Sequence, residues 1–158
     1  MLQNRFLYFT SSARSIFKEA QQSAESYQQT YVAPEHFLIG ITSGKATTAS
    51  RLLNKLEVDP SRLKVAAEQA IADQLASHPD FRERWLGLTE EAKRVVELAV
   101  DEASQEQLNF VGSEHVLLAL LRQRGTLASE VLEKVGISLE RARAKLQSLR
   151  REGHLSEP

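Results

Sequence analysis

The chain has 158 residues, 42% of them hydrophobic and 26% charged, so it is long enough to bury a core and does not have the composition of a disordered protein. Its 20 basic and 21 acidic residues leave a formal net charge of −1, which argues against nucleic acid or an anionic membrane as a partner. There is no cysteine, so disulfides and thiolate chemistry are excluded. Because the start lacks a signal-peptide pattern and no run approaches about 18 apolar residues, we expect a cytoplasmic protein.

The chain is organised as a tandem repeat. Residues 10 to 67 align without a gap with residues 89 to 146, at an offset of 79. A Glu-His pair followed by an apolar run therefore occurs twice because the sequence is duplicated. The matching positions include Thr10 and Thr89, Glu35 and Glu114, and His36 and His115.

Each repeat is predicted to contain four helices. The first begins at Thr10 or Thr89, whose hydroxyl is suited to cap a helix N-terminus, and continues with small and apolar residues at helical spacing. The second contains the runs FLIGI or VLLALL, which are apolar almost all round and are expected to be enclosed by the other helices. After a short third helix, Asp59 or Ser138 is predicted to cap the fourth. No segment alternates convincingly as a strand.

These elements predict an all-α fold of about eight helices in a single domain, residues 1–158. Repeat 1 is expected over residues 9–75, a linker over 76–87, repeat 2 over 88–151 and a polar tail over 152–158. In the linker, Phe81 and Trp85 are spaced i, i+4, which is typical of a short helical turn packed on the core. The alternative is that they form an exposed anchor for a partner protein.

Several kinds of chemistry have little support in the sequence. There is neither a nucleophile elbow nor a Walker phosphate loop, so we expect no catalysis by the chain itself and no cofactor. Adjacent Glu and His residues on a helix point about 100° apart and do not chelate a metal as a pair. A small metalloenzyme would need the two repeats to bring His36 and His115 together, so it is a remote alternative. The other interpretation is that each His holds its helix entry by hydrogen bonds.

Molecular recognition is the remaining class of function. Glu35 and Glu114 fall at predicted helix N-termini, where free N–H groups also attract anions. With the hydroxyl of Thr10 or Thr89 nearby, such a site could hold a ligand that is cationic at one end and anionic at the other. The alternative is that each Glu only stabilises its own helix through the helix dipole.

The twofold pattern resembles a known family. The segments FTSSARSIFKEAQQSA, VAPEHFLIGI and ASRLLNKLEVDPSRL, with their copies LTEEAKRVVELAVDEA, VGSEHVLLALL and ASEVLEKVGISLERA, look like the N-terminal domain of Clp ATPases, above all the ClpC type. The resemblance covers the chain from Phe9 to about Leu149. It implies a pseudo-twofold, non-catalytic domain that receives substrates or adaptor proteins for an AAA+ unfoldase or protease.

In the ClpC branch the resemblance further implies recognition of phosphorylated arginine, with one pocket per repeat. The residues that match the family's pockets are Glu114 and Thr89, and Glu35 and Thr10. Ser113 before Glu114 keeps the family's small hydroxyl residue, whereas Pro34 before Glu35 has no N–H, so the first pocket is the weaker match. Because no ATPase module accompanies the repeats, an alternative is a free-standing accessory or regulatory protein that modulates a Clp protease complex.

Overall fold

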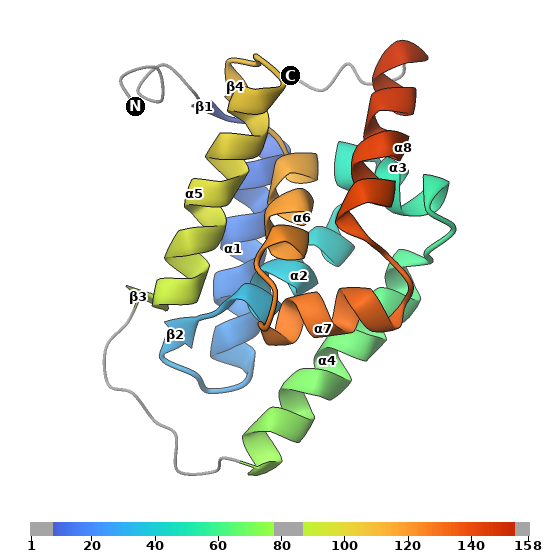
Figure 1. The fold of residues 1–158 in the computed structure, drawn as a ribbon. Helices are drawn as coiled ribbons and strands as arrows, with labels where there is room; N and C mark the ends of the chain where they lie inside the picture. The colour runs from blue at the N-terminus through green and yellow to red at the C-terminus, as the bar shows by residue number, and fades with distance from the viewer. Residues whose placement is uncertain (1–7, 78–86, 154–158) are drawn as a thin grey trace.

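A computed structural model describes residues 8–77 and 87–153. Phe81 and Trp85 lie outside the described residues, so their packing stays a prediction. No helix in the described ranges is long and apolar enough to cross a membrane. The elements, in chain order, are β1 (Tyr8–Phe9), α1 (Ser11–Ser26), β2 (Tyr31–Val32), α2 (Pro34–Ser43), α3 (Thr48–Lys55), α4 (Pro60–Ser77), β3 (Gly87–Leu88), α5 (Glu90–Gln105), β4 (Phe110–Val111), α6 (Ser113–Arg122), α7 (Leu127–Lys134) and α8 (Leu139–Arg151) (Figure 1).

The all-α prediction is confirmed, with α1 to α4 in the first repeat and α5 to α8 in the second. The predicted N-caps are present as well. The Thr10 hydroxyl accepts a hydrogen bond from the N–H of Ala13 at 3.1 Å, and that of Thr89 accepts from Ala92 at 3.0 Å. Ser138 caps α8 in the same way. Each such cap satisfies an otherwise unpaired N–H and contributes about 1 kcal/mol to stability.

The core is built around α2 and α6, which lie between the other helices (Figure 1). Every residue from Pro34 to Ile41 and from Ser113 to Leu121 is buried, as the apolar runs predicted. Close packing against α1 is set by a glycine. A Cβ atom added to Gly40 would lie 2.6 Å from the carbonyl oxygen of Ile16, so any larger residue would push the two helices apart.

Two short parallel strand pairs join the repeats, and the sequence did not predict them. In the first, Tyr8 pairs with Phe110, and in the second, Tyr31 pairs with Gly87. Each strand has two residues, which is too short for an alternating pattern to be recognised.

The strand pairs continue into the helix starts. The N–H of Thr10 donates to the carbonyl of Val111, and that of Thr89 donates to the carbonyl of Val32, both at 3.0 Å. Each pair therefore places the start of the first helix of one repeat beside the start of the second helix of the other.

Candidate functional site

Glu35 and Glu114 occupy the second residue of α2 and α6, where the helix dipole favours a carboxylate. The predicted placement at helix N-termini is therefore confirmed. Both residues are buried, with 6% of Glu35 and 1% of Glu114 exposed. A charged carboxylate at this depth is costly unless a cation or several hydrogen-bond donors compensate it. The surroundings of the two carboxylates therefore decide what each can do.

The neighbouring histidines hold the helix entries, as one of the two interpretations proposed. Nδ1 of His36 accepts a hydrogen bond from the N–H of its N-cap residue at 2.9 Å, and Nε2 lies 2.7 Å from Oε1 of Gln29. His115 repeats this arrangement, with Nε2 2.7 Å from Oε1 of Glu106. Burial lowers the pKa of His36 to about 4. Both ring nitrogens of each histidine are thus engaged, and no three potential metal ligands gather within the described ranges.

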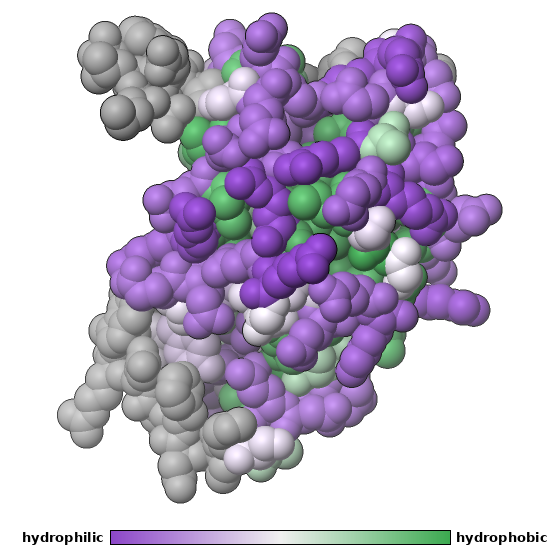
Figure 2. All heavy atoms as spheres, viewed as in Figure 1, coloured by the Kyte–Doolittle hydropathy of each residue, from purple (hydrophilic) through white to green (hydrophobic). Residues whose placement is uncertain are grey.

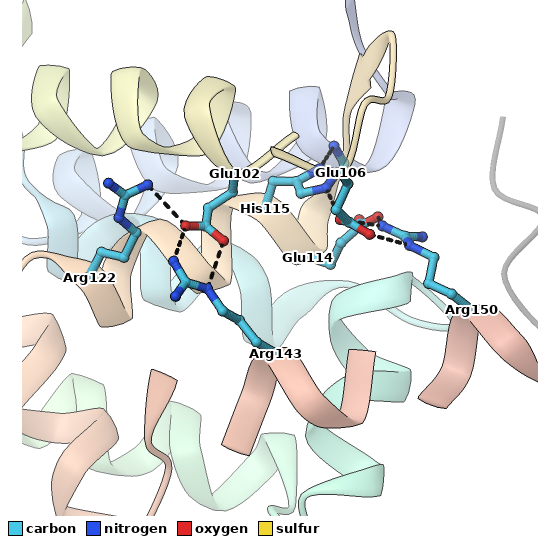
Figure 3. A network of polar contacts seen from close by, with 8 residues as sticks. Glu102, Glu106, Glu114, His115, Arg122, Arg143 and Arg150 are labelled. Atoms are coloured by element: carbon cyan, nitrogen blue, oxygen red, sulfur yellow. Dashed lines mark hydrogen bonds and ion pairs between the residues drawn. The ribbon is translucent and has the colours of Figure 1, made fainter. Parts of the chain in front are cut away.

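In the second repeat, Glu114 binds an arginine of the same chain (Figure 3). Nη2 of Arg150, on α8, donates to Oε2 of Glu114 at 2.8 Å. The same guanidinium donates to both oxygens of Glu106, at 2.8 and 3.0 Å. Burial alone would raise the pKa of Glu106, but hydrogen bonds from His115 and Arg150 outweigh it and lower this pKa to about 2. Arg150 therefore serves two carboxylates at once.

A second ionic cluster joins α5, α6 and α8 in this repeat (Figure 3). Glu102 is only 4% exposed and accepts hydrogen bonds from Arg143 at 2.6 and 3.2 Å and from Arg122 at 2.9 Å. Arg122 also binds Asp101, at 2.6 Å. The face formed by α5, α6 and α8 is accordingly mostly hydrophilic (Figure 2). These contacts tie the last helix to the rest of the second repeat.

The first repeat has none of this network. The equivalent positions, 79 residues earlier, hold neither an acidic residue nor an arginine. They are Ser23 for Glu102, Tyr27 for Glu106, Ser43 for Arg122, Lys64 for Arg143 and Ile71 for Arg150.

The carboxyl of Glu35 is therefore left without a cation. It forms no ion pair with any residue of the described ranges. Its pKa is raised to about 7, mainly by burial and to a smaller extent by the charge of Glu91, while a hydrogen bond from its own backbone N–H acts in the opposite direction. The two equivalent glutamates thus have opposite electrostatic surroundings.

The strand pairs join each threonine to the stretch of the opposite repeat that leads to its glutamate. The strand pairs bring Thr10 alongside Val111, three residues before Glu114, and Thr89 alongside Val32, three residues before Glu35. Each glutamate-bearing helix start is therefore joined by backbone hydrogen bonds to a threonine of the opposite repeat. The cause is the crosswise pairing of the short strands.

The residues before the two glutamates also have structural roles. The hydroxyl of Ser113 accepts a hydrogen bond from the N–H of Ala49, at the start of α3, at 3.0 Å. Pro34 is the first residue of α2, a position where a missing N–H costs nothing. The contrast between Ser113 and Pro34 is thus partly a matter of how the repeats pack together.

An apolar groove follows the seam between β2 and β3. It has a volume of about 670 Å³, and Phe17 of α1 and Val96 of α5, which are equivalent in the two repeats, both line it. The rest of its apolar lining is formed by Phe9, Ala24, Tyr31, Val32, Phe37 and Leu88, and Gln21, Glu25, Gln29 and Thr30 add polar groups. The sequence did not predict this groove, because its walls come from both repeats and from a strand pair that has no sequence signal.

Fold and site together define a duplicated helical module that presents a groove and two buried carboxylates at the junctions of its halves. The Clp repeat (R) N-terminal domain family matches residues 8–83 and 87–156, and the chain belongs to this family.

Among its relatives is the ATP-binding subunit ClpC of the ATP-dependent Clp protease from Staphylococcus saprophyticus, 31% identical over 137 residues. That match covers 87% of this chain but 16% of the ClpC subunit. The fold is shared with the Hsp104 N-terminal domain from Candida albicans, with a TM-score of 0.71, 19% identity, and coverage of 90% of this chain and 91% of that one. A ClpV N-domain in complex with a VipB peptide has a TM-score of 0.64 and 18% identity, covering 95% and 90% of the two chains.

Proposed function

We propose that this domain binds segments of client or adaptor proteins for a Clp AAA+ unfoldase or protease and performs no catalysis itself. The observation that carries the proposal is the apolar groove along the β2 and β3 seam. Its volume of about 670 Å³ lies within the range of binding pockets in proteins. Aromatic and aliphatic side chains in a concave surface, with a few polar groups beside them, are typical of sites that bind an apolar segment.

The relatives support this proposal. The chain matches the N-terminal part of ClpC, and a domain of the same fold, from ClpV, has been solved with a bound peptide. Because the second strand pair closes one wall of the groove, the groove depends on the two repeats being correctly joined. A partner segment would thus be bound only by the assembled domain.

An unfolded protein provides a direct test. We expect fluorescently labelled, reduced and carboxymethylated α-lactalbumin to bind the domain in a fluorescence anisotropy titration. Val96→Glu places a charge in the groove and should weaken binding about tenfold, because a carboxylate buried against an apolar segment loses its hydration. Val65→Glu is the matched control, since Val65 is 65% exposed on α4 and does not line the groove. Absence of binding, or an equal loss in both variants, would contradict the proposal.

A narrower form of the proposal is recognition of arginine-phosphorylated proteins at the site of Glu114 and Thr10. It is supported by the fact that Glu114 binds a guanidinium group, that of Arg150. Ser11 and Ser12, in the first turn of α1, carry no charge that would repel a phosphate. A phosphoarginine peptide should bind more tightly than its unmodified control, and Glu114→Ala should remove the difference. Equal affinities of the two peptides would disprove this form and leave the groove proposal standing.

A further inference from the structure

A second groove lies between α4 and α7, which pack side by side (Figure 1), and it shares no lining residue with the groove at the β2 and β3 seam. The volume of this α4–α7 groove is about 470 Å³. Its apolar lining comes from Ala66 and Ala70 of α4 and from Leu127 and Val131 of α7. Of these four residues only Val131 is buried, so most of the apolar lining is partly open to solvent.

The pseudo-twofold counterpart of this groove lies between α3 and α8, and an ion pair spans it. Nζ of Lys55 donates to Oε1 of Glu152 at 3.4 Å, and both residues line that counterpart groove. The alignment of the repeats places Lys134 opposite Lys55 and Asp73 opposite Glu152. Lys134 and Asp73 line the α4–α7 groove and are exposed, yet neither forms an ion pair within the described ranges. Aspartate is one methylene shorter than glutamate, and the carboxylate of Asp73 accepts a hydrogen bond from Gln69 of its own helix, at 2.9 Å.

An exposed apolar side chain stands beside the α4–α7 groove. Val65 of α4 is 65% exposed, and the other exposed large apolar side chain among the described residues is Tyr8. Because Val65 directly precedes Ala66 on the helix, its side chain points about 100° away from that of Ala66 and does not line the groove. The equivalent position of α8 is occupied by Ala144. Burial of Val65 therefore requires a second molecule.

We propose that the α4–α7 groove is the interface of a weak dimer of this chain, with the two copies related by a two-fold axis. Val65 of each copy enters the apolar part of the other's groove, and Asp73 of each copy pairs with Lys134 of the other. The chain itself thus supplies an apolar side chain, a base and an acid, which are the three groups that the groove leaves without a partner. A partner with charges of a single sign would be repelled by one of the two walls. This inference is independent of the proposed function.

Sedimentation equilibrium tests the dimer. The unaltered chain should dimerise reversibly with a dissociation constant on the order of 100 µM, as expected for a small interface. Asp73→Lys places two lysines at each of the two symmetric contacts, and Lys134→Asp places two aspartates there. Each single variant should weaken dimerisation about tenfold or more, because like charges that face each other across an interface repel.

An equimolar mixture of Asp73→Lys and Lys134→Asp distinguishes this interface from other arrangements. In a mixed dimer the introduced lysine meets the introduced aspartate at one contact. At the other contact the original lysine of the first variant meets the original aspartate of the second. The mixture should therefore dimerise about as tightly as the unaltered chain, although each variant alone is monomeric.

The second repeat supplies matched controls. Lys55→Asp and Glu152→Lys reverse the charges of the groove between α3 and α8 and should leave dimerisation unchanged. Val65→Glu should weaken the dimer about tenfold, because it brings a carboxylate into the apolar part of the groove. Ala144→Glu, at the equivalent position of α8, should have no effect. Every substituted residue in this series is exposed, so the folded chain should tolerate the changes, as circular dichroism will show.

The outcomes separate this inference from the proposed function. A chain that is monomeric at about 1 mM, or a dimer that Asp73→Lys does not weaken, overturns the inference. A mixture of the two charge variants that stays monomeric overturns it as well. If the α4–α7 groove received client segments instead, Asp73→Lys would weaken the binding of α-lactalbumin to a chain that is monomeric throughout. On our proposal Asp73→Lys binds α-lactalbumin normally and Val96→Glu dimerises normally, so either proposal can fail without the other.

Discussion

The two repeats place the same buried glutamate at the same turn and surround it with opposite electrostatics. Glu114 is paired with Arg150, whose guanidinium also binds Glu106. Glu35 has no cation in the described ranges, and its pKa is raised to about 7. Duplication has therefore kept the backbone arrangement and the carboxylate while the compensating charge has diverged. The lesson is that a motif shared by two repeats does not make their binding chemistry equal.

The last helices of the two repeats, α4 and α8, also differ in their ionic contacts. In α4 the buried residues are the apolar Leu63, Ala67 and Ile71, and no ion pair within the described ranges involves this helix. In α8, Arg143 and Arg150 reach buried carboxylates in addition to an apolar stripe. We therefore expect the second repeat, and not the first, to lose stability when its charges are removed.

The largest effect is expected for Glu102→Ala. The change leaves Arg122 and Arg143 without their shared buried acceptor and should cost about 3 kcal/mol in free energy of unfolding, at the lower end for broken buried pairs because both arginines are partly exposed. The equivalent change in the first repeat, Ser23→Ala, should stay within about 0.5 kcal/mol. Urea unfolding followed by circular dichroism measures both. A loss of similar size in the two variants would remove the contrast between α4 and α8.

A smaller effect is expected at the contact between the first and second helices of each repeat. Gly40→Ala introduces a Cβ 2.6 Å from the carbonyl of Ile16 and should destabilise the domain by about 2 kcal/mol, even though alanine favours a helix by about 1 kcal/mol. The second repeat has Ala119 at the equivalent position. Ala119→Gly should cost only about 1 kcal/mol, from helix propensity. Stabilisation by Gly40→Ala in thermal unfolding would show that α1 and α2 can separate freely.

The third prediction compares the stability of Glu35→Gln with that of Glu114→Gln. Between pH 4.5 and about 7, folded Glu35 holds a proton that the unfolded chain has lost, so its contribution to stability falls as the pH rises through this window. The shift from 4.5 to about 7 sets a ceiling of about 3 kcal/mol. Glu35→Gln removes the cost of ionising a buried carboxyl, but a buried amide needs hydrogen-bond partners of its own. The change should therefore stabilise the domain at pH 8 by less than this ceiling, about 1 to 2 kcal/mol. Glu114→Gln should destabilise it by about 1 kcal/mol, since Arg150 loses a charged acceptor.

The pH dependence of the stability of Glu35→Gln gives a further prediction. His36 has a folded pKa of about 4, so the unfolded chain binds its proton first, and stability falls as the pH drops from 6.5 to 4. In the unaltered domain this slope opposes that of Glu35. In Glu35→Gln the His36 slope should stand alone, and urea midpoints should rise from pH 4.5 to 6.5. Midpoints that change equally in both proteins would show that Glu35 is ionised in the folded state throughout.

Much of the fold follows from the sequence, because helices carry their signals locally. Apolar spacing identified the helices, and Thr10 and Thr89 marked two of their starts. The strand pairs lacked any such signal, since each has two residues and pairs with a partner far along the chain. The prediction that the pocket of Glu35 is the weaker match used only the preceding residues, Pro34 and Ser113. The two glutamates differ in charge environment because of Arg150, which lies 36 residues after Glu114. Aligning the repeats places Ile71, 36 residues after Glu35, opposite Arg150, so the sequence does record this difference.

The crosswise strand pairs have a consequence for how such a domain can arise. Thr10 bonds to Val111 and Thr89 bonds to Val32, so each half gives the other the same contact that it receives. Reciprocal contacts of this kind define an isologous dimer. One repeat produced alone would leave its strand edges and the matching helix entries uncovered, and a second copy of itself is the surface that fits them. In its geometry, the domain is a symmetric dimer whose two subunits have been joined into one chain.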